Sequence, residues 1–292
     1  MNSLVDKLYS GKVLLMDGAM GSELQRAGLA DSECPELWNL QHPERVRRVH
    51  QAYVDAGADC LLTNTFQASK PALKARGSVR QLDAIQKAAI DLARSVAGRE
   101  RYVFADIGPL AEVDGLEPRD LESLYPETES IDALFLETWS DPVAFFVVKL
   151  LRIAGWCEPL PIFVSFTFRR QPDGQLVSQS GHPPEWFAAM ARQYDVTAIG
   201  VNCGLDIGMD EIIEIVRRFR SVTELPIVAR PNAGTPVERD GQWVYPRTPT
   251  SIARKLPELL DAGVAMVGGC CGVGPEYIAA MRPIIDDWNA GH

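Results

Sequence analysis

Three cysteines in two glycine-flanked motifs are the residues of this chain whose types and spacing best suit metal chemistry. Cys270 and Cys271 are adjacent within Gly268-Gly269-Cys270-Cys271-Gly272, and Cys203 lies in Gly200-Val201-Asn202-Cys203-Gly204. Three thiolates can hold one zinc ion and leave its fourth position open, which is typical of a catalytic rather than a structural site. The adjacent pair is also compatible with two buried thiols or with a disulfide between neighbours.

Adjacent cysteines can share one metal only where the backbone leaves the extended conformation, because successive side chains of a strand point to opposite faces. Gly268, Gly269 and Gly272 make that departure sterically easy. For Cys60 and Cys157 we expect packing roles instead.

The composition favours small molecules as partners and predicts neither a nucleic-acid nor a membrane partner. The chain has 292 residues, 46% of them hydrophobic, and a formal net charge of -10. Such a surplus of negative charge disfavours polyanions. The sequence shows neither a signal-peptide pattern nor an apolar run of membrane-spanning length. We therefore expect a cytoplasmic protein whose cysteines are thiols or metal ligands rather than disulfides.

Eight apolar runs alternate with amphipathic stretches, which is the pattern of parallel strands joined by crossover helices. The predicted strands are residues 13–17, 60–66, 102–107, 133–139, 162–168, 198–203, 227–231 and 265–270. The main predicted helices are residues 43–56, 79–96, 142–154, 184–194, 209–219, 251–261 and 275–288.

This alternation predicts an α/β fold with one domain over residues 1–292, a single (β/α)8 TIM barrel. A doubly wound open sheet is the alternative. Between residues 108 and 131 only residues 119–124 have helical character, so the third helix is expected to be shortened.

Active-site groups of such barrels lie where the strands end. The polar residues at these positions are Asp17, Thr63, Asn64, Thr65, Glu137, Cys203, Asn232, Cys270 and Cys271. The sixth and eighth strands are near neighbours around the rim, so the cysteines can meet over one mouth.

Six motifs, each at a predicted strand end, resemble those of the zinc-dependent homocysteine S-methyltransferase family. They are Met16-Asp17-Gly18-Ala19-Met20-Gly21, Thr63-Asn64-Thr65-Phe66, Phe135-Leu136-Glu137-Thr138, Pro231-Asn232-Ala233-Gly234 and the two cysteine motifs. The resemblance implies that Cys203, Cys270 and Cys271 ligate Zn2+, and that the thiol of homocysteine takes the open position and becomes methylated, giving methionine. A free thiol, with a reference pKa of about 8.5, is mostly protonated at neutral pH, whereas a zinc-bound thiol is deprotonated.

The amino-acid end of such a substrate needs its own partners. Backbone N–H groups at Gly18, Ala19 and Met20 can form a nest for its carboxylate. By resemblance, Glu137 and Asp17 bind its ammonium group. The alternatives are a buried ion pair for Glu137 and a helix or turn cap for Asp17.

Four further residues are predicted to support the site. Thr63, Asn64 and Asn202 are expected to orient the metal ligands through hydrogen bonds, with the alternative that each is an ordinary polar group of the barrel interior. Asn232 is expected to shape the mouth beside the metal.

The methyl donor is less constrained by the sequence. Donors in the family are sulfonium or quaternary ammonium compounds, or a methylated corrinoid. A cation can lie against an aromatic face, and Trp38 is the candidate for that contact, followed by Trp139, with rim packing as the alternative. We expect S-methylmethionine or a related sulfonium as the donor.

Two alternatives to this function remain open. Residues 230–236 and 245–249 resemble the homocysteine-binding part of cobalamin-dependent methionine synthases, so the chain is alternatively a subunit that docks a separate corrinoid protein and methylates homocysteine or another thiol. A barrel with a purely structural zinc is the other alternative.

Overall fold

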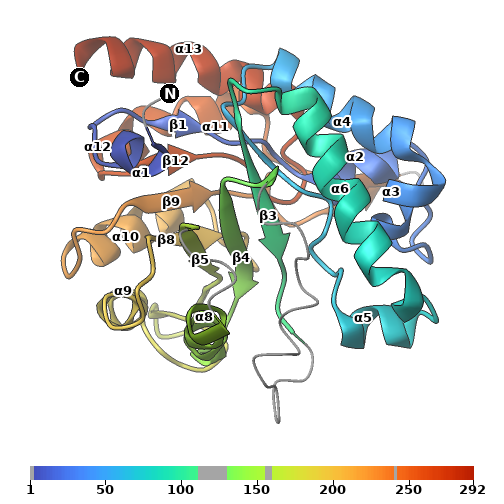
Figure 1. The fold of residues 1–292 in the computed structure, drawn as a ribbon. Coiled ribbons are helices and arrows are strands. Elements are labelled where there is room, and N and C mark those ends of the chain that lie inside the picture. Colours follow the sequence, from blue (N-terminus) through green and yellow to red (C-terminus); the bar gives the residue numbers. More distant parts are fainter. Residues whose placement is uncertain (1–2, 111–129, 155–159, 240–241) are drawn as a thin grey trace.

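The protein is described by a computed structural model covering residues 3–110, 130–154, 160–239 and 242–292. Eight parallel strands form the central sheet (Figure 1), in the order β1-β12-β9-β8-β5-β4-β3-β2. An isolated parallel bridge between Met16 and Cys60 joins the first strand to the second and completes the ring. The predicted TIM barrel is therefore confirmed, and the open doubly wound sheet is not the observed fold.

All eight predicted strands are present, although several end earlier than predicted. Their bounds are β1 (Leu14–Leu15), β2 (Cys60–Leu62), β3 (Tyr102–Ile107), β4 (Ala133–Trp139), β5 (Ile162–Phe166), β8 (Ala198–Asn202), β9 (Ile227–Arg230) and β12 (Met266–Val267).

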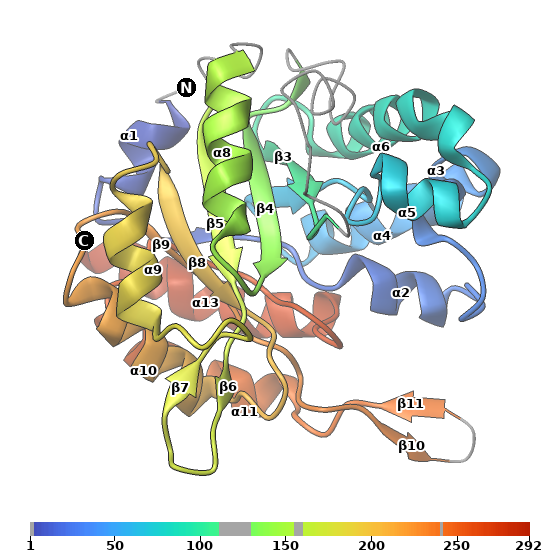
Figure 2. The same cartoon turned by 90° about the horizontal axis from the view of Figure 1, so that it is seen from below.

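Helices cover the outside of the barrel (Figures 1 and 2). The longer ones are α4 (Pro43–Asp55), α6 (Leu82–Ala97), α8 (Val143–Ala154), α9 (Pro184–Ala191), α10 (Met209–Arg220) and α13 (Pro275–Gly291). The shorter ones are α1 (Leu4–Leu8), α2 (Met20–Arg26), α3 (Trp38–Gln41), α5 (Lys70–Ala75), α11 (Pro249–Ala253), α12 (Leu256–Asp261) and the 3-10 turns η1 (Pro35–Leu37) and η2 (Val79–Gln81).

Two helix predictions need comment. The predicted helix 251–261 is divided into α11 and α12, because Pro257 lacks an N–H and its ring clashes with a preceding helical carbonyl. Residues 119–124 and Cys157 lie outside the described residues. Cys60 is fully buried, in keeping with its expected packing role.

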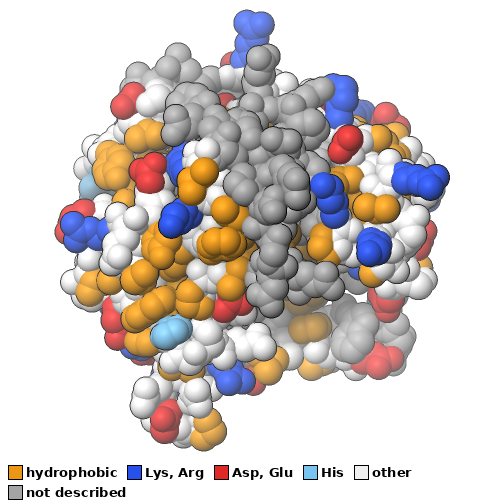
Figure 3. Space-filling view, turned by 60° about the horizontal axis from the view of Figure 1, so that its bottom comes forward, with side chains coloured by type: hydrophobic (Ala, Val, Ile, Leu, Met, Phe, Trp, Pro, Cys, Tyr) orange, Lys and Arg blue, Asp and Glu red, His pale blue; other side chains and the backbone are white. Residues whose placement is uncertain are grey.

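Two hairpins that the sequence did not predict follow strand ends on the active-site side of the barrel. The first pairs β6 (Arg169–Arg170) with β7 (Leu176–Val177), and the second pairs β10 (Val237–Arg239) with β11 (Gln242–Val244). Figure 2 shows the second hairpin reaching away from the barrel. On the face seen in Figure 3, positive and negative side chains are interspersed with apolar ones over the described residues.

Alternate residues of the strands fill the barrel interior. One apolar cluster contains Met16, Leu62, Phe104, Phe135 and other inward-facing residues, together with side chains of α1. Residues two positions apart on a strand share a face, so the next inward-facing residues after Phe104 and Phe135 are Asp106 and Glu137. Five buried polar residues lie at this level, near the ends of the strands, and we call them the interior polar layer: Asp106, Glu137, Ser165, Asn202 and Arg230. This layer forms the floor beneath the loops that carry the cysteines.

Candidate active site

The structure brings the three predicted cysteines together. Their sulfur atoms all lie within 4.8 Å of one another, with Cys203 Sγ 3.6 Å and Cys270 Sγ 4.0 Å from Cys271 Sγ. Cys203 follows β8 with a positive φ of 53°, a conformation that non-glycine residues adopt rarely. Cys270 and Cys271 lie in the loop after β12, beyond the regular strand, and Gly272 there has a φ of 76°. Both departures from extended backbone turn neighbouring side chains toward one centre.

The thiols of this cluster share protons unequally. Hydrogen bonds from Cys270 and Cys271 lower the pKa of Cys203 to about 3. The hydrogen bond to Cys203 is the main cause that raises the pKa of Cys270 well above its ordinary value and that of Cys271 to about 12. Three close sulfurs fit a thiophilic ion such as zinc, which binds thiolates and would displace the remaining protons.

Two asparagines hold the sulfur cluster in place. Asn202 Nδ2 donates to Thr138 Oγ1 at 2.6 Å and lies 3.6 Å from Cys270 Sγ, while its Oδ1 accepts from Ser165 Oγ at 2.6 Å. Asn232 Nδ2 donates to the Gly204 carbonyl at 3.1 Å and lies 3.9 Å from Cys203 Sγ. Both side chains therefore lie where the sequence expected supporting residues.

Thr63 and Asn64 lie in the wall of the cavity. Thr63 Oγ1 accepts from Asp106 N at 3.0 Å and lies 2.6 Å from Thr65 Oγ1. Asn64 Nδ2 donates to the Pro35 carbonyl at 2.8 Å. The contacts described for both residues fix the cavity wall, and none of them reaches a cysteine.

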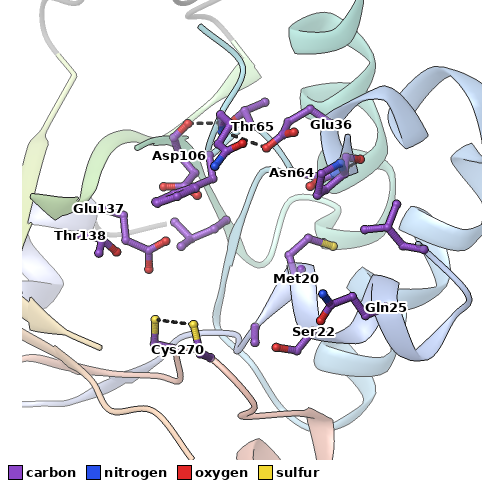
Figure 4. A pocket seen from close by; sticks show the side chains of 18 of the residues that line it. Met20, Ser22, Gln25, Glu36, Asn64, Thr65, Asp106, Glu137, Thr138 and Cys270 are labelled. Atoms are coloured by element: carbon purple, nitrogen blue, oxygen red, sulfur yellow. Dashed lines mark hydrogen bonds between the residues drawn. The ribbon is translucent and has the colours of Figure 1, made fainter. Parts of the chain in front are cut away.

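A cavity of about 490 Å³ extends from the cysteines across the mouth of the barrel. Figure 4 shows Glu137 close to Cys270, Asp106 on the same wall and Glu36 farther across. The lining residues include Gly18, Ala19, Met20, Glu36, Thr63, Asn64, Phe66, Arg76, Asp106, Glu137, Cys203, Arg230, Cys270 and Cys271. This volume suits a small-molecule substrate.

Asp17 is not among the residues that line this cavity. Its side chain is 1% exposed, with Oδ2 accepting from Leu62 N at 2.8 Å and Oδ1 3.3 Å from Arg230 Nη1. Burial raises the pKa of Asp17 to about 7, although Arg230 opposes that rise. In this structure Asp17 is therefore the partner of a buried guanidinium.

Arg230 is the main site residue that sequence reasoning missed. Its Nε donates to the Gly269 carbonyl at 3.0 Å and lies 3.3 Å from Glu137 Oε1, and its Nη2 donates to the Gly18 carbonyl at 3.2 Å. Burial lowers its pKa, but Glu137 and Asp17 raise it above its ordinary value, so the group stays charged. Arg230 therefore ties the strand-one loop to the loop that precedes Cys270.

Glu137 lines the cavity as predicted, and Asp106, which the sequence analysis overlooked, lines it as well. Burial raises the pKa of both carboxyls, and Arg230 lowers both. The signal for Asp106 and Arg230 was present in the sequence, because each follows an inward-facing apolar residue by two positions.

The predicted carboxylate nest is only partly available. Gly18, Ala19 and Met20 line the cavity, but Ala19 N donates to the Val273 carbonyl at 3.0 Å. A Cβ at Gly18 would lie 2.1 Å from the same carbonyl, so this close approach requires glycine.

Neither tryptophan proposed for the donor lines the cavity. Trp38 is 1% exposed and packs against His42, with Arg45 over its ring at 5.0 Å. Trp139 Nε1 donates to the Ile107 carbonyl at 3.3 Å. Packing, the alternative for Trp38, is therefore what the structure shows, and Phe66 is an aromatic residue that does line the cavity.

Comparisons with known proteins identify the family of the chain. The sequence profile of the family described as homocysteine S-methyltransferase matches residues 14–285. Methionine synthase of Mycobacterium leprae is 29% identical over 96% of this chain and 25% of its own length, and that of Mycobacterium tuberculosis is 29% identical over 97% and 25%. This chain thus spans about a quarter of the length of these relatives.

Solved structures give the same assignment. The metallated form of the homocysteine methyltransferase MmuM from Escherichia coli is 26% identical, covers 94% of this chain and 96% of that one, and superimposes with a TM-score of 0.71. Among the described residues, no helix is long and apolar enough to cross a membrane. Since the family profile covers nearly the whole barrel, the chain belongs to the homocysteine S-methyltransferase family.

Proposed function

We propose that the protein transfers a methyl group from a small cationic donor, S-methylmethionine or a related sulfonium, to the thiol of homocysteine, giving methionine. The observation that carries the proposal is the cluster of Cys203, Cys270 and Cys271 at one end of a cavity lined by buried carboxyls. These three cysteines would hold zinc, which supplies a substrate thiolate at neutral pH.

The residues of the chain would then position the reacting groups. Glu137 binds the substrate ammonium, while Asn202 and Asn232 orient the cysteine sulfurs through the contacts described above. The substrate sulfur attacks the methyl carbon in line with the donor sulfur. The new S–CH3 bond forms as the donor S–CH3 bond breaks, and the electron pair of the broken bond stays on the donor sulfur. The transfer therefore needs no general acid for a sulfonium donor.

The charge of the site favours a cationic donor. Among the described residues, the buried carboxyls that line the cavity are those of Glu36, Asp106 and Glu137, and the buried guanidinium that lines it is that of Arg230. A cavity with this excess of acidic groups attracts cations and disfavours anions. The match to the homocysteine methyltransferase MmuM, which covers 96% of that chain, supports homocysteine as the methyl acceptor.

The alternative is methyl transfer from a separate corrinoid protein, and the similarity to one quarter of the methionine synthases favours it. A donor panel with zinc-loaded protein and homocysteine separates the two. Methionine formed from S-methylmethionine supports the first proposal. Methionine formed only with a methylated corrinoid protein, and not with sulfonium or betaine donors, would replace it by the second.

A further inference from the structure

We propose that Thr138 is a positioning residue of the metal site. Its left-handed backbone conformation orients the side-chain amide of Asn202, which then donates a hydrogen bond to the sulfur of Cys270. The inference rests on the function proposed above, because it concerns cysteines that would hold zinc. It adds a residue of β4 to a site whose sulfur ligands lie in the loops after β8 and β12.

The backbone of β4 is irregular at Thr138. The register between β4 and β5 shifts between Leu136 and Trp139, because β4 has an extra residue over this stretch. Such a β-bulge is rare between parallel strands, and bulges beside active sites redirect side chains. Glu137 and Thr138 are consecutive residues, yet both line the cavity (Figure 4). A regular strand would point them to opposite faces.

Thr138 also has a backbone conformation that is unfavourable for its residue type. Its φ is 61°, in the left-handed region. A β-branched residue is an outlier there, because its Cβ crowds the backbone. Strained conformations of this kind persist only where the surrounding structure imposes them, and they cluster at functional sites. The contacts that hold Thr138 therefore indicate what it does.

These contacts form a reciprocal pair with Asn202, which is fully buried. Thr138 N donates to Asn202 Oδ1 at 3.1 Å, and Asn202 Nδ2 donates to Thr138 Oγ1 at 2.6 Å. Ser165 Oγ also donates to Oδ1, at 2.6 Å, and Nδ2 donates to Cys270 Sγ at 3.6 Å. A primary amide has two N–H donors and an oxygen that accepts two bonds, so these four contacts use its whole capacity.

The backbone N–H of Thr138 decides which way this amide faces. Because an N–H group can only donate, the atom of Asn202 opposite it must be the oxygen. The NH2 group is then directed to Thr138 Oγ1 and to Cys270 Sγ. A bond of this kind fixes the sulfur and withdraws charge from it. Loss of such a contact to a metal ligand typically costs about 10–100-fold in metal affinity.

Replacing Thr138 tests this role through metal affinity and spectroscopy. Thr138→Val keeps the branched shape but lacks the hydroxyl, so the bond that offsets the strained conformation is lost and the amide is released. Its zinc affinity, measured by competition with a chromophoric chelator, should fall about tenfold or more. In the Co2+-loaded protein, Cys270 should carry more charge. The sulfur-to-cobalt charge-transfer band should therefore move to longer wavelength.

Matched variants separate the backbone from the hydroxyl. Thr138→Ser keeps the hydroxyl and should restore both the zinc affinity and the band. Thr138→Gly adopts a positive φ without strain and keeps the N–H, so it should bind zinc more tightly than Thr138→Val. Thr63→Val is the control, because Thr63 is a buried threonine of the cavity wall whose described contacts reach no cysteine. It should keep the wild-type zinc affinity and band.

A double variant shows whether Thr138 acts through Asn202. Asn202→Ala should weaken zinc binding as Thr138→Val does, and Thr138→Val/Asn202→Ala should lose no more than Asn202→Ala alone. Additive losses overturn the inference, because Thr138 would then affect the metal independently of the amide.

A purely structural role for Thr138 predicts a different result. Thr138→Val would then lower the midpoint of urea unfolding but keep the wild-type zinc affinity and band, which overturns the inference. An affinity of Thr138→Gly no higher than that of Thr138→Val overturns it as well. If Thr138→Val does not fold, the smaller Thr138→Ala takes its place with the same expectations. Failure of the wild-type protein to bind zinc or Co2+ would instead contradict the proposed function, which separates the two failures.

Discussion

The guanidinium of Arg230 lies between two carboxylates in different surroundings, 3.3 Å from Asp17 Oδ1 and 3.3 Å from Glu137 Oε1. Asp17 is enclosed, whereas Glu137 lines the cavity. The same guanidinium donates to the carbonyls of Gly18 and Gly269. A single buried side chain thus compensates charge beneath the substrate site and joins the two loops at its rim.

Replacing Arg230 should therefore be severely destabilising. Arg230→Met leaves Asp17 and Glu137 buried without this cation, and breaking a buried pair costs about 3–5 kcal/mol. The free energy of unfolding from urea titration measures the loss. The double variant Arg230→Met/Asp17→Asn should recover part of it. If Arg230→Met has the same midpoint of urea unfolding as the wild type, the ion pair does not stabilise the folded protein.

The three cysteines should behave as one metal site. Alanine at Cys203, Cys270 or Cys271 should abolish tight zinc binding and methionine formation, because two thiolates remain where three are needed. The barrel should still fold, since its apolar interior lies below the cluster. Metal analysis, activity and far-UV circular dichroism check these outcomes.

Cys60→Ala is the matched control for that series, because Cys60 is a buried thiol of the interior apolar cluster. It should keep one zinc per chain. Retention of a full equivalent of zinc by Cys203→Ala would show that the metal is held elsewhere.

Asp17 should make the stability of the protein depend on pH. Its folded-state pKa is raised to about 7 from 3.8, so the protonated carboxyl is favoured on folding. The resulting contribution to stability is complete below the unfolded pKa and is lost as pH rises through the folded value. The free energy of unfolding of the wild type, relative to that of Asp17→Asn, should therefore decrease as the pH rises from 4 to 7.

Urea unfolding across that pH range measures the difference. Comparing the two proteins removes the contributions of other groups, including Cys203, whose lowered pKa acts in the opposite direction. A stability difference that stays constant with pH would mean that Asp17 has the same protonation in both states.

The barrel was predictable because its signal is repeated along the chain, and the cysteine site because its residue types are rare and lie at strand ends. Asp106 and Arg230 escaped prediction for a different reason. Neither belongs to a chemically distinctive motif, and their role depends on pointing inward at one level of several strands. Whether Asp17 faces the cavity was decided by a long-range contact with Arg230, 213 residues away, which local pattern does not encode.

Trp38 provides the sharpest contrast between the sequence prediction and the structure. A rim tryptophan that binds the donor should, on replacement by alanine, raise the KM for the donor. The structure instead buries Trp38, the first residue of α3, against His42 and Arg45, and it does not line the cavity. Trp38→Ala should thus cost about 3–5 kcal/mol of stability by creating a cavity.

Trp38→Phe should retain most of that stability and leave the KM for the donor unchanged. Phe66→Leu, which alters a cavity-lining ring, should raise the KM for the donor. Steady-state kinetics with S-methylmethionine at saturating homocysteine, combined with thermal unfolding, compares the three variants. If the folded Trp38→Phe protein had a raised KM for the donor and Phe66→Leu did not, Trp38 would be a donor-binding residue after all.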